Sequence, residues 1–111
     1  ADIIPMEREY GAMKAALNGY ASQLSHRLAK DGVRSNIITP GPIDFPGGFW
    51  DQVKQANEEM FNRASQISAL KRHGTAQEVA NAAVFLSSPA ASYITGANLR
   101  VDGGALKQVN Y

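Results

Sequence analysis

The sequence predicts an α/β fold, and three observations lead to this prediction. Apolar residues recur at steps of three and four over residues 8–30, which predicts an amphipathic helix. A short apolar run at residues 33–39 follows directly and predicts a buried strand of a parallel sheet. The order helix, strand, helix, helix, strand is then completed near residue 101. Because two isolated parallel strands do not make a stable sheet, this order predicts the carboxyl-terminal part of a doubly wound domain.

The first predicted helix and strand have clear ends. Lys30 lies in the last turn of the helix and Gly32 follows it, which is a common way for a helix to stop. The strand ends at Pro40-Gly41-Pro42, and Pro46-Gly47-Gly48 comes soon after. This segment is therefore predicted to be a loop at the carboxyl end of a strand, where open α/β sheets bind ligands.

The second predicted helix covers residues 49–63 and begins with two aromatic residues, Phe49 and Trp50, beside Gly47-Gly48. Two interpretations stay open for these aromatics. They form a mobile lid over an apolar substrate, or they pack on the core of the domain.

The third predicted helix starts at a capping box. Thr75-Ala76-Gln77-Glu78 has the Ser/Thr-x-x-Glu pattern that fixes a helix start, and Ser88-Pro89 ends the helix. Residues 97–101 then form the last predicted strand, and Asp102 is predicted to form a turn.

Composition excludes several classes of protein. The 111 residues suffice for one domain, and a net charge of +1 with interspersed signs gives no basic patch for nucleic acid. Cysteine is absent, so disulfides and thiolate metal sites are excluded. No apolar run reaches the roughly 18 residues of a membrane span. The start has no signal-peptide pattern and no initiator Met, so we expect a cytoplasmic protein and a piece of a longer chain.

Tyr10 and Lys14 are the most informative pair of residues. Four residues apart on a helix, they lie on one face, about 6 Å apart along the axis. A phenol has a pKa of about 10, and a nearby ammonium lowers it. Such a pair can move a proton at a carbonyl or alcohol oxygen. The alternative is a surface tyrosine beside a solvated lysine.

Four motifs in one order carry a family resemblance. They are Tyr10-x-x-x-Lys14, residues 36–41 (NIITPG), residues 72–80 (RHGTAQEVA) with 85–88 (FLSS), and residues 93–104 (YITGANLRVDGG). Together they resemble the carboxyl-terminal half of a short-chain dehydrogenase/reductase. The resemblance implies a Rossmann-like domain, of which residues 1–111 are the second half and the nucleotide-binding first half is absent.

The resemblance also implies roles for individual residues. Tyr10 is the general acid/base, and Lys14 lowers its pKa and binds the nicotinamide ribose of NAD or NADP. The loop formed by Pro40, Gly41, Pro42 and Ile43 flanks the nicotinamide, and the backbone of Ile43 bonds its carboxamide. A glycine in this loop permits close approach of the cofactor.

Other residues receive weaker roles or none. Asp44, Phe49 and Trp50 are candidates for the substrate pocket, and no metal site is expected. The histidines His26 and His73 are expected at the surface, with contact with the substrate pocket as the alternative for His73, and Glu58-Glu59 is expected on a solvated helix face.

Departures from the family pattern limit what the chain itself can do. The serine that family members carry upstream of the tyrosine falls before residue 1, and no glycine-rich phosphate loop occurs. Met13 and Phe45 replace a common serine and threonine. The expected activity, interconversion of a carbonyl and an alcohol by hydride transfer, therefore belongs to a full-length protein, and the 111 residues alone are expected to be inactive.

A second hypothesis is a non-catalytic, self-associating module. The resemblance implies that the tyrosine-bearing helix and the last helix and strand contact another subunit, as in a homodimer or homotetramer. Exposed apolar faces would favour such association. Substrate identity, the choice between NAD and NADP, and the direction of the reaction stay open.

Overall fold

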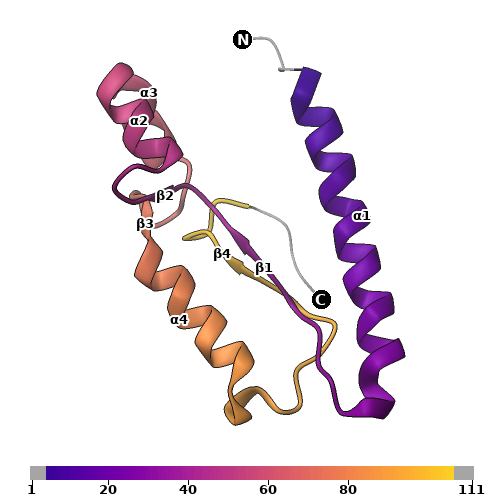
Figure 1. The fold of residues 1–111 in the computed structure, drawn as a ribbon. Coiled ribbons are helices and arrows are strands. Elements are labelled where there is room, and N and C mark those ends of the chain that lie inside the picture. The colour runs from indigo at the N-terminus through magenta and orange to yellow at the C-terminus, as the bar shows by residue number, and fades with distance from the viewer. Residues whose placement is uncertain (1–4, 107–111) are drawn as a thin grey trace. The chain divides into compact units, whose positions relative to one another are not determined.

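The computed structural model describes the backbone of residues 5–106 and the side chains of residues 12–106 (Figure 1). The chain divides into two compact units. One comprises residues 1–37 and 91–98, and the other comprises residues 38–90 and 99–111. The helices and strands mix as an α/β fold requires, which confirms the predicted fold class.

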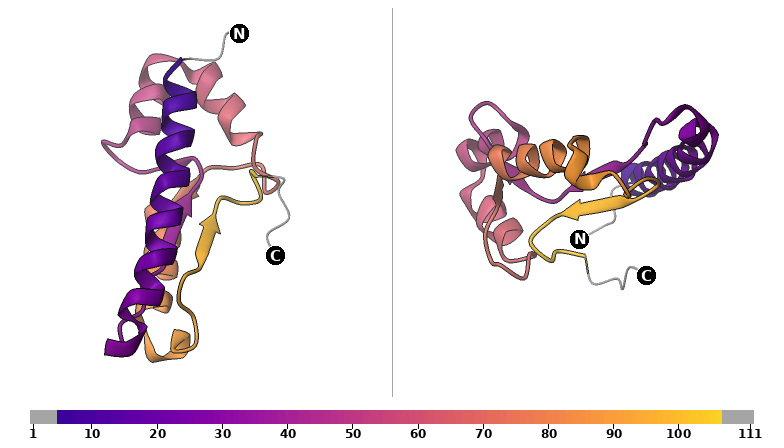
Figure 2. Two further views of the ribbon diagram at one scale, coloured as in Figure 1. Left: turned by 90° about the vertical axis from the view of Figure 1, so that its right-hand side faces the viewer. Right: turned by 90° about the horizontal axis from the view of Figure 1, so that it is seen from below.

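The first unit is dominated by one long helix, α1 (Pro5–Leu28), followed by the 3₁₀ turn η1 (Ala29–Asp31). Figure 2 shows α1 as one continuous helix in both views. Proline is tolerated in a first helical turn, because the N–H that it lacks has no partner there. Gly32 ends the segment with φ at 72°, the left-handed conformation that glycine adopts without steric cost. The predicted helix is thus confirmed, with an earlier start.

The strand predicted over residues 33–39 is wrong in its first half, because only β1 (Ile37–Pro40) is a strand. Side chains replace the strand ladder before it. Asn36 donates through Nδ2 to the carbonyl of Ile94 at 3.0 Å and accepts at Oδ1 from the N–H of Ala97 at 3.0 Å. These bonds join segments that lie far apart in the sequence, and they take the place of regular strand pairing.

The last strand, β4 (Asn98–Val101), pairs with β1 in a two-stranded sheet. The Ile37 N–H bonds to the Ala97 carbonyl at 2.8 Å, and the Gly41 N–H bonds to the Val101 carbonyl at 3.0 Å. Both strands advance by four residues between these two bonds, so they run parallel. The predicted strand at residues 97–101 is confirmed to within one residue.

A second, very short sheet corrects the prediction of a plain loop after Pro40. β2 (Ile43–Asp44) pairs in parallel with β3 (Gly74–Thr75), and Ile43 lies opposite Gly74. The Gly74 N–H extends the ladder to the carbonyl of Pro42 at 2.9 Å. The partner strand, β3, lies about thirty residues further along the chain, so no local sequence pattern predicts this pairing.

The single helix predicted over residues 49–63 is wrong. Two helices are present, α2 (Phe49–Ala56) and α3 (Glu58–Ser65), separated at Asn57. Asn57 leaves the helical conformation, with φ −154° and ψ 87°, and its Oδ1 accepts the Met60 N–H at 3.1 Å. Asparagine is a preferred N-cap, so the residue that starts α3 is also the one at which α2 ends.

The predicted capping box is confirmed at the start of α4 (Ala76–Ser87), which is followed by the 3₁₀ turn η2 (Pro89–Ala91). Thr75 Oγ1 accepts the Glu78 N–H at 3.2 Å, and Glu78 Oε1 accepts the Thr75 N–H at 3.0 Å. Two backbone donors of the first turn are satisfied in this way.

Few side chains are buried within the described part of the chain. The buried set is Ser25, Ala64, Ser68, Leu86 and Ala91, and several large apolar side chains are largely exposed. No helix among the described residues is long and apolar enough to cross a membrane. The described residues therefore leave much apolar surface that they do not cover themselves.

Candidate functional site

The predicted catalytic pair belongs to α1 in the first unit. Positions 10 and 14 are one turn apart, because the helix is unbroken from Pro5 to Leu28. The side chain of Tyr10 lies outside the described residues, while that of Lys14 is partly buried. The placement of both residues on one helix is therefore described, and their catalytic role stays a prediction.

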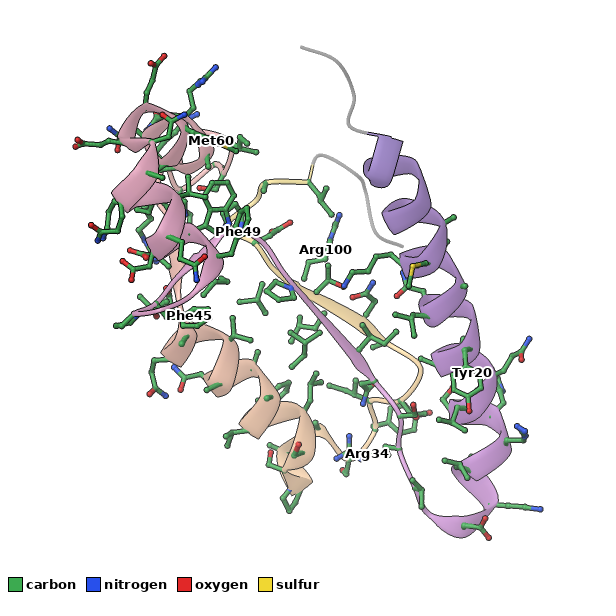
Figure 3. The ribbon with its side chains drawn as sticks, turned by 45° about the horizontal axis from the view of Figure 1, so that its top comes forward. Tyr20, Arg34, Phe45, Phe49, Met60 and Arg100 are labelled. Carbon is green, nitrogen blue, oxygen red and sulfur yellow. The ribbon has the colours of Figure 1, made fainter. Side chains whose placement is uncertain are left out.

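One face of α1 carries a stripe of exposed apolar side chains. Met13, Leu17 and Tyr20 are 66%, 55% and 57% exposed. Their spacing of four and three residues puts them on one face, and Figure 3 shows Tyr20 projecting from α1. This exposed stripe could contact another subunit, but self-association itself stays a prediction.

The predicted cofactor loop begins at Pro40, the last residue of β1, in the second unit. A Cβ added at Gly41 would lie 2.8 Å from the Cβ and 2.9 Å from the Cα of Asp102. The missing side chain at Gly41 thus lets the backbone approach Asp102. This packing contact gives a further reason for a glycine at position 41, and the predicted close approach of a cofactor stays a prediction.

Ile43 is held in a geometry that leaves its own amide facing away from β3. In the parallel ladder, Gly74 donates to the carbonyl of Pro42, so Pro42 and Asp44 face Gly74 through their backbone polar groups. Backbone groups of successive strand residues alternate in direction. The N–H and C=O of Ile43 therefore point to the other side of the strand, where a planar amide could bond to them.

Asp44 is engaged by a side chain of the neighbouring helix. Its Oδ2 lies 3.5 Å from Nζ of Lys54, and the two side chains are 30% and 41% exposed. Lys54 Nζ also lies 5.1 Å from the centroid of the Phe61 ring. Within the described residues the Asp44 carboxylate is paired with the Lys54 ammonium. A contact of Asp44 with substrate stays a prediction.

The two aromatics at the start of α2 behave differently. Phe49 is 63% exposed, whereas Trp50 is partly buried. The Trp50 ring lies 5.1 Å from that of Phe49, edge to face, and 5.3 Å from that of His73. Trp50 thus packs, and Phe49 remains available to a ligand or to another part of the protein.

His73, which the sequence places at the surface or against the substrate pocket, is half-buried. Its ring stacks on Phe61 at 4.1 Å and 19°, and its Nε2 lies 2.9 Å from the Phe61 carbonyl oxygen. A carbonyl only accepts, so Nε2 carries the hydrogen. Nδ1 is buried and has no hydrogen-bond partner within the described residues. No sequence signal links residues 61 and 73. The other histidine, His26, is exposed as predicted.

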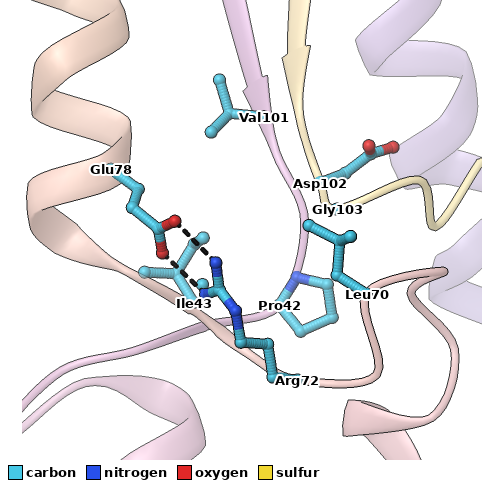
Figure 4. Close-up of a pocket in the computed structure, with 9 residues that line it drawn as sticks. Pro42, Ile43, Leu70, Arg72, Glu78, Val101, Asp102 and Gly103 are labelled. Atoms are coloured by element: carbon cyan, nitrogen blue, oxygen red, sulfur yellow. Dashed lines mark hydrogen bonds and ion pairs between the residues drawn. The ribbon is translucent and has the colours of Figure 1, made fainter.

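A pocket in the second unit has a charged pair in its wall (Figure 4). Arg72 donates from Nη1 and Nη2 to the two carboxylate oxygens of Glu78, each at 2.8 Å. This paired geometry is the strongest arrangement for the two groups. The lining residues are Pro42, Ile43, Leu70, Arg72, Gly74, Glu78, Val101, Asp102 and Gly103.

The electrostatics of this pair indicate a structural role. The Arg72 hydrogen bonds, followed by the Thr75 backbone N–H, lower the pKa of Glu78 to about 2. Glu78 in turn raises the pKa of Arg72. Both groups are ionised at neutral pH, so the pair fixes the start of α4 and does not exchange protons there.

Two minor predictions are confirmed. Asp102 forms its turn by accepting the Gly104 N–H at 2.9 Å and the Leu106 N–H at 3.1 Å. Glu58 and Glu59 are exposed on α3. Within the described residues, no cluster of His, Cys, Asp or Glu is suited to a metal ion.

Comparison with known proteins gives consistent matches over most of the chain. A sequence profile of the family described as enoyl-(acyl carrier protein) reductase matches residues 1–105. The isoepoxydon dehydrogenase of Penicillium expansum is 45% identical over 95 residues, which is 86% of this chain and 37% of that enzyme.

Solved structures match as well. An oxidoreductase of the short chain dehydrogenase/reductase family from Burkholderia thailandensis has a TM-score of 0.78 and 42% identity over 89% of this chain and 38% of that one. An NADPH-dependent reductase involved in bacilysin biosynthesis has a TM-score of 0.77 and 34% identity, over 88% of this chain and 39% of that one. The chain therefore spans little more than a third of the proteins that it matches.

Proposed function

Because the chain belongs to the short-chain dehydrogenase/reductase family, we propose that its full-length protein is an NAD(P)-dependent oxidoreductase. The proposed reaction interconverts a carbonyl and an alcohol by hydride transfer. Tyr10 and Lys14 carry the proposal, since a phenol and an ammonium one helical turn apart are the acid–base pair that this reaction needs.

Tyr10 is proposed to hold and move the proton at the substrate oxygen. In reduction its hydroxyl protonates the oxygen as negative charge develops there, and in oxidation its phenolate takes the alcohol proton. The Lys14 ammonium favours the phenolate and so lowers the pKa of Tyr10 toward neutrality. A proton donor whose pKa lies near the working pH is the most effective one.

The residues at the end of β1 suit the nicotinamide end of the cofactor. The Ile43 amide, directed away from β3, is a fixed donor and acceptor for a carboxamide. A bound nicotinamide supplies or accepts the hydride. The chain's own contribution is to orient that ring through Ile43 and, we propose, the ribose hydroxyls through Lys14.

The substrate is proposed to contact the exposed start of α2. Phe49 offers an apolar surface that is 63% exposed, and Asp44 lies on β2, just before this helix. The sequence contains no glycine-rich phosphate loop and no upstream serine, so the 111 residues alone are expected to be inactive.

Replacing Tyr10 by Phe in the full-length protein tests the proposal. The change removes one hydroxyl, and we expect kcat to fall by about 10²- to 10⁴-fold, the usual contribution of a positioned acid or base. Oxidation of NADPH or NADH with a ketone measures the rate, and dinucleotide affinity should stay close to that of the wild type. Normal turnover by Tyr10→Phe would exclude Tyr10 as the acid/base.

A further inference from the structure

The turn that follows β4 has a tightly defined backbone. The Ala105 N–H donates to the Asp102 carbonyl at 3.1 Å, and the two residues between them, Gly103 and Gly104, have φ angles of 60° and 81°. A positive φ at both central positions is the pattern of a type I′ turn, which favours two glycines. The residue types of this segment therefore match the conformation that it adopts.

The Asp102 carboxylate holds this turn together. Oδ1 accepts the Gly104 N–H at 2.9 Å, and Oδ2 accepts the Leu106 N–H at 3.1 Å. Figure 4 shows the carboxylate directed away from the Arg72–Glu78 pair. Hydrogen bonds to an ionised acceptor are stronger than those between neutral groups. The carboxylate therefore sets the path of the backbone after β4.

Gly41, in the predicted cofactor loop, lies directly against Asp102. A Cβ added at Gly41 would lie 2.8 Å from the Asp102 Cβ and 2.9 Å from its Cα, closer than real Cβ atoms approach. The Gly41 N–H also donates to the carbonyl of Val101 at 3.0 Å. The position of Gly41 is therefore set by Asp102 and by the residue before it.

The same turn also meets the segment between α3 and β3. The Leu70 N–H donates to the Gly103 carbonyl at 3.1 Å, and a Cβ added at Gly104 would lie 2.8 Å from the Cβ of Ala69. The turn thus has two close neighbours, Gly41 and this segment. A change in the shape of the turn must displace at least one of them.

Ser68 makes the segment between α3 and β3 a firm base for the turn. Its side chain is 1% exposed, and a Cβ added at Gly103 would lie 3.2 Å from its Cβ. Ser68 Oγ donates to the Arg72 carbonyl at 3.0 Å and accepts the Arg72 N–H at 3.3 Å. Arg72 is bonded in turn to Glu78 of α4. Because this side of the turn is braced, a change in the turn is passed on to Gly41.

From these contacts we propose that Asp102 is a positioning residue for the nicotinamide end of the dinucleotide. By shaping its turn, the carboxylate sets where Gly41 lies, and Gly41 sets the path of the chain to Ile43, two residues further on. Asp102 acts on the dinucleotide through these two residues and does not touch it. The effect on the dinucleotide rests on the proposed function, whereas the effect on the turn does not.

Binding of two ligands to the full-length protein tests this role. NADH or NADPH carries the nicotinamide, whereas ADP-ribose, or its 2′-phosphate for an NADPH-binding protein, lacks it. In Asp102→Ala we expect Kd for the dinucleotide to rise about tenfold, the effect of losing about one hydrogen bond at the carboxamide. Kd for the ADP-ribose ligand should change by no more than about twofold, because only the nicotinamide end is displaced.

Two further variants serve as controls for Asp102→Ala. Asp102→Asn keeps one oxygen acceptor and a similar size, so its Kd for the dinucleotide should lie between those of the wild type and Asp102→Ala. Asp31→Ala removes an exposed carboxylate from η1 and should match the wild type with both ligands. Equal weakening of both ligands in Asp102→Ala would indicate a general loosening of the fold and would overturn the positioning role. Unchanged affinity for both would overturn it as well.

Amide hydrogen exchange without ligand tests the turn itself. In Asp102→Ala the amides of Gly104 and Leu106 lose their acceptor and should exchange about tenfold faster. The Gly41 amide should also exchange faster, because its neighbour has moved. Unchanged exchange at all three amides would show that the carboxylate does not shape the turn. A wild type that binds no dinucleotide would contradict the proposed function and the nicotinamide role together, while the exchange comparison still decides the effect on the turn.

Discussion

α1 and the segment from Pro42 to Glu78 are organised in opposite ways. α1 is a single regular element, and the relation between positions 10 and 14 follows from helix geometry alone. The Pro42–Glu78 segment contains two short strands and two short helices, joined by a ladder, a stacked histidine and a paired arginine. Helix geometry alone places Tyr10 beside Lys14, the proposed acid–base pair. The proposed binding residues, Ile43 and Phe49, are positioned by contacts between residues far apart in the sequence.

This difference predicts how each region responds to substitution. A change on α1 should act on the proton chemistry or on helix propensity, with little effect beyond the helix. A change in the Pro42–Glu78 segment should act through neighbours that the sequence does not reveal. Three predictions test this contrast, beginning with the largest effect.

Replacing Lys14 by Met should reduce activity in the full-length protein by about 10²-fold at neutral pH, within the range of acid–base contributions. In the proposed mechanism, loss of the ammonium raises the pKa of Tyr10, so less phenolate is present. In alcohol oxidation the rate rises as pH passes the Tyr10 pKa. The midpoint of the profile of kcat against pH should therefore move to higher pH.

The direction of that shift is the decisive observation. Lys14→Arg keeps a positive charge and should leave the midpoint closer to that of the wild type. If Lys14→Met loses activity with an unmoved midpoint, the lysine acts on binding alone and not on the tyrosine proton.

The same contrast explains what the sequence predicted well. The long helix, the Thr75 capping box and the Asp102 turn depend on residues a few positions apart, and all three are confirmed. The family resemblance, which uses residue types in a fixed order, is confirmed too. Such features are visible in the sequence because the interactions that create them are local.

The failures have the opposite cause. Residues 33–36 have an apolar start typical of a strand, but their polar groups bond to residues 94–97 instead. The break at Asn57 was hidden because aromatic residues continue on both sides of it. His73 was placed at the surface because its partner Phe61 lies twelve residues away on another element. Tertiary contacts override local preference at residues 33–36 and at His73, whereas at Asn57 a local helix cap competes with a continuous helix.

Gly19 in α1 and Gly41, which immediately precedes the Pro42–Glu78 segment, test the contrast by the sign of their effect on stability. Gly19 lies inside α1, where an added Cβ meets nothing within 4 Å. Gly19→Ala should therefore stabilise the protein by about 0.5–1 kcal/mol, the difference in helix propensity. An added Cβ at Gly41 would lie 2.9 Å from the Asp102 Cα, and Gly41→Ala should destabilise it by about 1–3 kcal/mol.

Urea unfolding of the full-length protein measures both variants. Each change is glycine to alanine, so the two serve as controls for one another. Destabilisation by Gly19→Ala would mean that the exposed face of α1 is covered closely by the rest of the protein. A neutral Gly41→Ala would show that the Asp102 turn relaxes at little cost.

The smallest expected effect concerns the pH dependence of stability at Glu78. Its folded-state pKa is lowered to about 2, mainly by Arg72, while an unfolded glutamate has a pKa of about 4.3. A lowered carboxyl pKa contributes stability above the unfolded value, and this contribution is lost as pH falls through the folded value. The free energy of unfolding of the wild type should thus decline between these two pH values more steeply than that of Glu78→Gln.

Arg72→Met separates the two causes of the shift. The Thr75 N–H still bonds to Glu78 in this variant, so part of the lowered pKa should remain. The slope of stability against pH should then be intermediate between those of the wild type and Glu78→Gln. Both side chains are exposed, so all three slopes should differ only modestly. An Arg72→Met slope equal to that of the wild type would mean that the capping box alone holds the carboxylate, and that the start of α4 is as local in origin as α1.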